Sequence, residues 1–446
     1  MSDPDRNGAA DAEAAFEFQR RTWESAADFL GKLGRVDDAN RRIADVDVGT
    51  TPSRVVYEEN KLELLHYEPR TDERHDVPVL FVYALFNKPF ILDLQPDRSV
   101  IRTFLDRGFD VYMIDWNEPS LLDHTLTFED YVDRYLDNCV DVVRKRSGRE
   151  AISLFGYCMG GAFSVLYAAL YPEKVRNLGL MATAVNLRDT DSVVDQWVGD
   201  DFFDPETLVE AYGNVPADIV DAAFSSREPV QNSLTKYLRF FEGIEDEEFV
   251  ENFARMERWI EESIDIPGRM LVDFIDATYH EQRIYNNEMY VGGRHADLEN
   301  LEMPIAQIIG NYDSVVPPEA PREFTDALPG DPAVFEADTG HMGLAVSGRS
   351  HAELWPAVCE WYAKRSGTEE PTGKTVDGTA AAEAEAEADL RAIDGIGASY
   401  ADRLRAAGIE SVADLADADP GALAAEAEVP EGRLEVWIER ARGRPD

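Results

Sequence analysis

Cys158 is the residue of this chain whose neighbours most clearly indicate chemistry, because it stands in the sequence Gly156-Tyr157-Cys158-Met159-Gly160-Gly161. An apolar strand-like stretch at 150–156 comes directly before it, and a stretch with helical spacing at 161–171 follows. Such a turn is a nucleophile elbow, in which the glycines remove side chains that would collide with the neighbouring strand and helix. The helix N-terminus behind the sulfur favours the thiolate. The sequence therefore predicts that Cys158 is a nucleophile.

A nucleophile that attacks a carbonyl group also needs hydrogen-bond donors for the oxygen that becomes negative. The N–H of Met159, the residue after the nucleophile, is the expected first donor. The second is expected from the loop after the apolar stretch 77–85, at Ala84 or the neighbouring Leu85.

A base and an orienting acid complete the predicted site. Asp313 and His341 each follow a strand-like stretch, at 303–310 and 333–337, and the chain order of nucleophile, acid and histidine is the one this turn requires. We expect Asp338 to be at most a supporting carboxylate and His351 to cap a helix or face solvent. The other histidines stand in no matching context, and the remaining cysteines are expected in the core; they are His66, His75, His124, His280, His295, Cys139 and Cys359.

The elements around these residues alternate between strands and helices, and the strands are apolar throughout. This pattern predicts a doubly wound, mostly parallel sheet, and with the elbow it predicts an α/β-hydrolase fold. Residues 187–300 break the alternation and are expected to form a helical cap. The expected strands are 61–67, 77–85, 110–116, 150–156, 175–181, 303–310 and 333–337, and the expected helices are 98–107, 128–146, 161–171 and 352–365.

The ends of the chain differ from this central domain, which is expected over 16–366. Residues 1–15 are polar and expected to be disordered. An amphipathic helix at 16–33 would pack on the domain or dock a partner. An acidic linker at 367–388 precedes a compact all-α unit at 389–446. Its segment Ile393-Asp394-Gly395-Ile396-Gly397 resembles a helix-hairpin-helix module, for which DNA contact, protein interaction and no separate role all stay open.

The charge of the 446-residue chain is unusual, since 88 acidic residues oppose 43 basic ones, of which eight are lysine, for a net charge of −45. Acidic residues spread along a lysine-poor chain are typical of proteins from salt-accumulating halophiles. The excess opposes binding to nucleic acids and anionic membranes. Three widely spaced cysteines are no disulfide framework. No secretory signal, membrane-span pattern, metal motif or dinucleotide motif is present, so we expect a cytoplasmic protein without metal or cofactor.

Several segments together resemble the polyhydroxyalkanoate synthases. They are the elbow, Val82-Tyr83-Ala84-Leu85, Leu94-Gln95-Pro96-Asp97, the stretch 110–116 and Asp313-x-x-Val316-Pro317-Pro318. The resemblance covers about 15–365 and is strongest to class III, the two-subunit type. Ser314 is a departure, because many relatives have histidine there.

The resemblance implies an activity and its partners. It implies transfer of (R)-3-hydroxyacyl groups, commonly 3-hydroxybutyryl, from CoA through a Cys158 thioester to a growing polyester. It also implies self-association, a second synthase subunit and a place at the surface of polyester granules. Two alternatives are a cysteine thioesterase or lactonase of the same fold and a granule-associated structural protein with an inactive site. DNA binding is the function that the net negative charge of the chain favours least.

Overall fold

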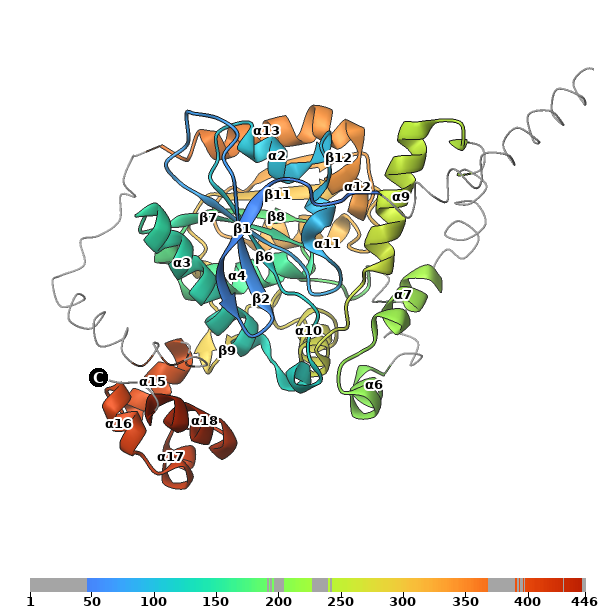
Figure 1. Ribbon diagram of the computed structural model, residues 1–446. Helices are drawn as coiled ribbons and strands as arrows, with labels where there is room; N and C mark the ends of the chain where they lie inside the picture. Colours follow the sequence, from blue (N-terminus) through green and yellow to red (C-terminus); the bar gives the residue numbers. More distant parts are fainter. Residues whose placement is uncertain are drawn as a thin grey trace, which may run out of the picture. The chain divides into compact units, whose positions relative to one another are not determined.

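The computed structural model describes residues 46–190, 192, 195, 204–226, 240, 243–367, 390, 393, 396, 398–427 and 429–442 (Figure 1). The predicted disordered N-terminus, the helix expected at 16–33 and nearly all of the acidic linker lie outside the described residues.

The central feature is an eight-stranded sheet with the strand order β1-β2-β6-β3-β7-β8-β11-β12. The strands from β6 to β12 run parallel to one another, and β2 near one edge pairs antiparallel with both of its neighbours, β1 and β6. The predicted mostly parallel, doubly wound sheet is therefore confirmed. The strands are β1 (Ser53–Glu59), β2 (Leu62–Tyr67), β3 (Val79–Val82), β6 (Val111–Asp115), β7 (Ile152–Tyr157), β8 (Val175–Met181), β11 (Ile305–Gly310) and β12 (Ala333–Ala337).

Helices cover both faces of this sheet (Figure 1). On one face lie α2 (Val100–Leu105) and α13 (Trp355–Ala363), whose buried aromatic rings pack against Phe155 of β7. On the other face lie α3 (Asp137–Ser147) and α4 (Met159–Leu170). The helix expected at 128–146 consists of two segments, because the π-helix η3 (Glu129–Leu136) precedes α3. Burial on both faces explains why β3, β7 and β8 are apolar throughout.

The strand expected at 77–85 is shorter than predicted. Only β3 is in the sheet, and Tyr83, Ala84 and Leu85 form a loop, although all three are at most 4% exposed. These residues are apolar because they are buried at the end of the sheet, and an apolar pattern does not distinguish a buried loop from a buried strand. The difference matters because this loop lies beside the elbow.

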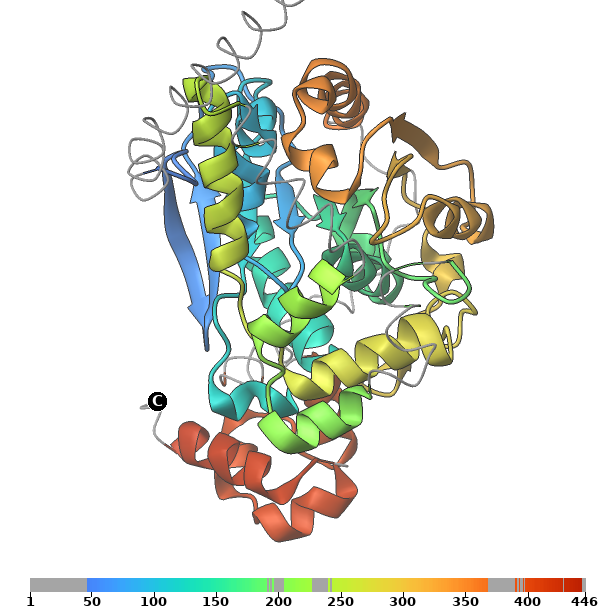
Figure 2. The same cartoon turned by 90° about the vertical axis from the view of Figure 1, so that its right-hand side faces the viewer.

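The chain between β8 and β11 is mostly helical in its described part, with one short antiparallel pair of strands, β9 (Tyr290–Val291) and β10 (Arg294–His295). It forms α6 (Pro205–Tyr212), α7 (Ala217–Ser226), α9 (Glu247–Glu261), α10 (Gly268–Ile275) and η6 (Asp276–His280). Helices α6 and α10 pack against each other (Figure 2). The chain divides into two compact units: residues 1–48 with 222–262, and the rest. In the smaller unit Ile244 and Val250 form an apolar cluster with Phe240.

The C-terminal segment forms a small helical module with its own apolar core. Its helices are α15 (Ala398–Ala406), α16 (Val412–Asp417), α17 (Pro420–Glu426) and α18 (Glu431–Arg442). Leu404, Leu415, Leu434 and Trp437 are at most 2% exposed in this core. Across the described part of the chain, none of the helices is apolar over the length that a bilayer crossing requires.

Candidate active site

Cys158 lies on the turn between β7 and α4, in a backbone conformation that few non-glycine residues adopt. Its φ is +56° and its ψ is −122°. The turn is held by hydrogen bonds on both sides: the Cys158 N–H donates to the Met181 carbonyl at 2.9 Å, and the Gly161 N–H donates to the Cys158 carbonyl at 3.0 Å. Strain that the surrounding structure maintains in this way is typical of functional positions. The side chain is 9% exposed at the carboxyl end of β7.

The glycines of the elbow are required by the packing around it. A Cβ on Gly156 would lie 2.5 Å from the Cα of Gly161. A Cβ on Gly160 would lie 2.1 Å from the Val82 carbonyl oxygen, and one on Gly161 would lie 2.3 Å from Oγ1 of Thr183. All three distances are shorter than any real contact, so α4 can begin this close to β3 and β8 only with glycine at these positions.

His341 and Asp313 come from the carboxyl ends of β12 and β11 and meet beside the elbow. The Asp313 Oδ2 lies 2.7 Å from the His341 Nδ1. The other carboxylate oxygen accepts hydrogen bonds from the N–H groups of Val315 and Val316, each at 2.9 Å. The carboxylate is thus fixed at both oxygens, and its side chain is fully buried. It orients the imidazole so that the second ring nitrogen is left for the cysteine sulfur.

The electrostatic environment of His341 favours the imidazolium. Burial lowers its pKa, but the charge of Asp313, the neighbouring Cys158 and hydrogen bonds to both raise it more, to about 10. This shift also shows that the thiol and the imidazole interact, which places all three predicted side chains in one group.

Tyr157 was not singled out in the sequence, and it supports the same histidine. Its ring stacks on the imidazole with 5.0 Å between centroids, and its hydroxyl donates to the His341 carbonyl at 3.1 Å. Burial raises the pKa of Tyr157 well above its usual value, so the phenol stays protonated and keeps donating. Its position next to the nucleophile was a signal that sequence analysis could have used.

The backbone N–H of Met159 and those of the loop after β3 have the properties of oxyanion donors. The N–H of Met159 is at the first position of α4, where no carbonyl of the helix can accept it. In the loop after β3, Ala84 and Leu85 are buried. Across the described residues, no hydrogen bond is formed by the N–H of Met159, Ala84 or Leu85. Buried N–H groups without an acceptor are rare, and they suit an oxygen that arrives with the substrate.

The other candidates from the sequence lie elsewhere. The Asp338 carboxylate contacts Asn311 and Arg349, at 3.0 and 3.4 Å. His351 lies in η8 (Ser350–Leu354), and its Nε2 is 2.7 Å from the Ala345 carbonyl in the last turn of α12 (His341–Val346), so its side chain contacts the end of that helix and is only partly exposed. Cys139 and Cys359 are unexposed core residues, and burial raises the pKa of both thiols. No group of potential metal ligands occurs within the described ranges.

The chain matches three family models. The alpha/beta hydrolase fold model covers residues 77–347, the model of the poly-beta-hydroxybutyrate polymerase (PhaC) N-terminus covers 30–104, and the SAM-like helix-hairpin-helix tandem covers 387–443. These matches confirm the predicted fold and the resemblance of the C-terminal unit. A solved structure of MenH from S. aureus is 18% identical, with a TM-score of 0.44 over 68% of this chain and 99% of that one.

Curated relatives match along nearly the whole chain. The PhaC subunit of poly(3-hydroxyalkanoate) polymerase from Haloferax mediterranei is 46% identical, over 97% of this chain and 99% of its own. The Haloarcula marismortui subunit is also 46% identical, over 96% and 98%, and the Allochromatium vinosum subunit is 37% identical, over 76% and 96%. Two of these organisms are haloarchaea, which supports the halophilic character expected from the charge. The chain is an acyltransferase that belongs to the poly(3-hydroxyalkanoate) polymerase PhaC family.

Proposed function

We propose that this chain polymerises (R)-3-hydroxyacyl groups, 3-hydroxybutyryl foremost, through a thioester on Cys158. The observation that carries the proposal is the group of three side chains at one edge of the sheet: a cysteine on a strained elbow, an imidazole next to it and a carboxylate 2.7 Å from that imidazole. A thiol suits this substrate, because exchange between two thioesters is nearly balanced in free energy.

In the first step the Cys158 thiolate attacks the carbonyl carbon of the acyl-CoA. The carbonyl oxygen becomes negative and accepts hydrogen bonds from the N–H of Met159 and from the loop at Ala84. The carbon–sulfur bond to CoA then breaks, and the departing sulfur takes the proton of the His341 imidazolium. The products are free CoA and an acylated Cys158 beside a neutral imidazole.

In the second step a hydroxyl group replaces the cysteine sulfur. Acylation removes the thiolate charge, which is one cause of the raised pKa of His341, so this pKa falls and the neutral imidazole is available to take the proton of that hydroxyl. The hydroxyl oxygen of another hydroxyacyl unit attacks the acyl carbon while His341 takes its proton. The new ester leaves, and the thiolate and imidazolium are restored.

The test is CoA release and polymer formation from 3-hydroxybutyryl-CoA at molar KCl. The wild-type protein is expected to release CoA and form insoluble polyester, and Cys158→Ala is expected to do neither. Cys359→Ala is the matched control, since it removes a buried thiol far from the elbow in the chain and leaves Cys158 in place. CoA release by Cys158→Ala at the wild-type rate would refute the proposal.

The second candidate is a cysteine hydrolase, in which water removes the acyl group. The same assay separates the two functions, because hydrolysis yields free 3-hydroxybutyrate in place of polymer. The family relationship favours the polymerase.

We further propose that the chain works with a second synthase subunit and lies at the surface of the polyester granule. The relatives are named as subunits of a polymerase, which supports the partner. Adding a candidate partner to the assay tests it.

A further inference from the structure

The loop after β3 has no regular structure to hold it in place. Tyr83, Ala84 and Leu85 follow the last strand residue, and the donors proposed for the oxyanion are the N–H groups of Ala84 and Leu85. A donor is useful only if it is directed before the reaction at the place where charge develops. Some other part of the molecule must therefore fix the direction of this loop.

Trp116, directly after β6, makes a direct hydrogen bond to this loop. Its indole Nε1–H donates to the Tyr83 carbonyl oxygen at 2.9 Å, and the tryptophan is 6% exposed. The indole ring itself is held edge-on by two aromatic rings, Tyr131 at 5.3 Å and Phe163 at 6.1 Å between centroids. A ring enclosed in this way presents its N–H in one direction.

The bond also determines where the next N–H points. In a trans peptide the carbonyl of one residue and the N–H of the following residue point in opposite directions. Fixing the Tyr83 carbonyl therefore fixes the Ala84 N–H and, through the chain, the start of Leu85. The Tyr83 carbonyl also lies against α4: a Cβ on Gly160 of that helix would come 2.7 Å from the carbonyl oxygen. The Tyr83 carbonyl therefore contacts both Trp116 and the first turn of α4.

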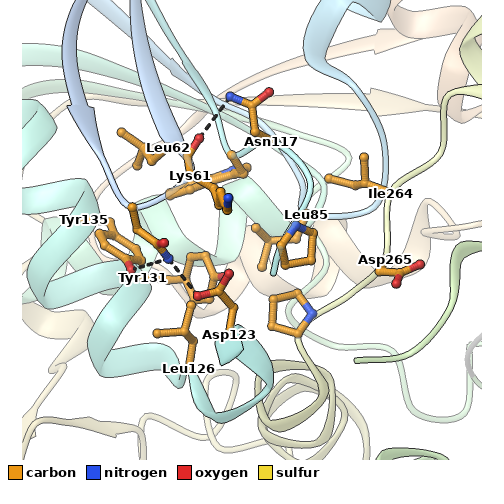
Figure 3. Close-up of a pocket in the computed structure, with 14 residues that line it drawn as sticks. Lys61, Leu62, Leu85, Asn117, Asp123, Leu126, Tyr131, Tyr135, Ile264 and Asp265 are labelled. Atoms are coloured by element: carbon orange, nitrogen blue, oxygen red, sulfur yellow. Dashed lines mark hydrogen bonds between the residues drawn. The ribbon is translucent and has the colours of Figure 1, made fainter. Parts of the chain in front are cut away.

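The residue after Trp116 is anchored as well. Asn117, with φ at +56°, donates from Nδ2 to the Lys61 carbonyl at 3.0 Å and accepts from Lys88 Nζ at 2.9 Å. Figure 3 shows Asn117 and Leu85 among the residues around one small pocket, with the bond from Asn117 to Lys61 drawn. Lys88 follows the loop in the chain, so the end of β6 holds the loop at Tyr83 and again near Lys88.

We propose that Trp116 is a positioning residue, which acts through the Tyr83 carbonyl to hold the second oxyanion donor in place. The inference rests on the proposed function, since it assumes an oxyanion formed by attack of Cys158. In this proposal the indole does not touch the substrate. Trp116 acts on the oxyanion donor entirely through the backbone of the loop. Loss of the indole N–H is therefore expected to slow acylation without affecting the nucleophile itself.

The experiment compares two reactions of Cys158 in two variants. Trp116→Phe removes the N–H and part of the ring, whereas replacement of Trp116 by 3-benzothienylalanine keeps the bicyclic shape and removes only the donor. The first reaction is the initial burst of CoA release from 3-hydroxybutyryl-CoA. The second is alkylation of Cys158 by iodoacetamide, which displaces iodide and forms no oxyanion. Cys139 and Cys359 are buried, and mass analysis of the peptides assigns the alkylated residue.

The burst rate constant of both Trp116 variants is expected to fall about tenfold or more, since loss of a whole oxyanion donor costs about 10²–10³ in rate. The alkylation rate is expected to stay close to the wild-type value, because displacement of iodide uses no oxyanion donor. Tyr362→Phe is the matched control: the Tyr362 hydroxyl donates to the Leu154 carbonyl at 2.9 Å in the middle of β7, so this variant also loses one buried hydrogen bond to a carbonyl. Its burst and alkylation rates should both remain unchanged.

Two results would overturn the inference. One is a wild-type burst rate in the benzothienylalanine protein. The other is a parallel loss of burst and alkylation in both variants, which would indicate a general disturbance of the elbow. A wild-type protein that is alkylated but releases no CoA would refute the proposed function, and the inference with it; this result appears in the wild-type sample alone and cannot be confused with the first two.

Discussion

At the scale of single residues, His341 is the group of the site whose pKa depends on both of its neighbours. The charges of Asp313 and Cys158 raise the histidine pKa from 6.5 to about 10 against the opposing effect of burial. The imidazolium thus persists across the neutral range and supplies the proton that the departing CoA sulfur needs. Acylation then removes one of those charges. The same residue can therefore act as an acid in the first step and as a base in the second.

The raised pKa of His341 also makes a prediction about stability. A histidine whose pKa is higher in the folded protein stabilises it fully below the unfolded value of 6.5, and this contribution is lost as the pH rises through about 10. Asp313→Asn removes the larger of the two raising charges. The unfolding temperature of this variant should therefore lie below that of the wild type at pH 6, and the difference should shrink toward pH 10.

Asp338→Asn provides the control for that measurement. Asp338 lies three residues before His341 in the chain, is half exposed, and contacts Asn311 and Arg349. Its substitution should give a small difference in unfolding temperature that does not vary between pH 6 and 10. A pH-independent difference for Asp313→Asn would contradict the role assigned to its charge.

At the scale of elements, the site depends on how closely α4 approaches the ends of β3 and β8. Each approach occurs at a glycine, and the first turn of the helix lies against the carbonyl groups of Val82 and Tyr83. Three separate strand ends, those of β7, β11 and β12, then deliver one side chain each. The parallel order of the sheet brings these ends to one edge, so residues 155 and 28 positions apart in the chain meet.

Gly160→Ala tests this close approach. The added methyl group would lie 2.1 Å from a backbone oxygen that cannot move without distorting β3. Overpacking of this kind typically costs about 1–3 kcal/mol, so the urea midpoint at molar KCl should fall, and CoA release should fall with it. Gly367→Ala is the control, since nothing lies within 4 Å of its Cβ position. Equal midpoints for the two variants would mean that α4 has more room than the structure shows.

At the scale of the whole molecule, the net charge of −45 is the dominant property. Carboxylates that repel one another destabilise any compact state, and dissolved salt screens this repulsion. The screening length falls from about 10 Å at 0.1 M salt to about 3 Å at 1 M. The fold therefore depends on its solvent as well as on its contacts.

The unfolding temperature is expected to rise steeply with KCl between 0.1 and 1 M and to level off above that range. Sucrose at matched osmolality is the control, because it is excluded from the protein surface but screens no charge. The KCl effect should exceed the sucrose effect clearly. Equal shifts in the two solutes would show that self-repulsion is not what limits stability at low salt.

The sequence by itself determined the features that depend on local pattern. Apolar runs and their alternation with helical stretches specified a doubly wound sheet, and the glycines around Cys158 specified the elbow. The positions of Asp313 and His341 after predicted strands selected them, because parallel strands end at one edge of a sheet. The sequence also predicted the strongly acidic surface and the separate helical module at the C-terminus.

Only the tertiary structure decided the features that depend on contacts between distant segments. It showed that β3 ends before Tyr83, that β1 and β2 add an antiparallel edge, and that the ring of Tyr157 stacks on His341. The bond from Trp116 to the Tyr83 carbonyl joins residues 33 positions apart. Neither residue type nor spacing indicates such a bond, because a buried tryptophan N–H can donate to any carbonyl that the packing brings to it. Which carbonyl that is depends on how β3, β6 and α4 fit together.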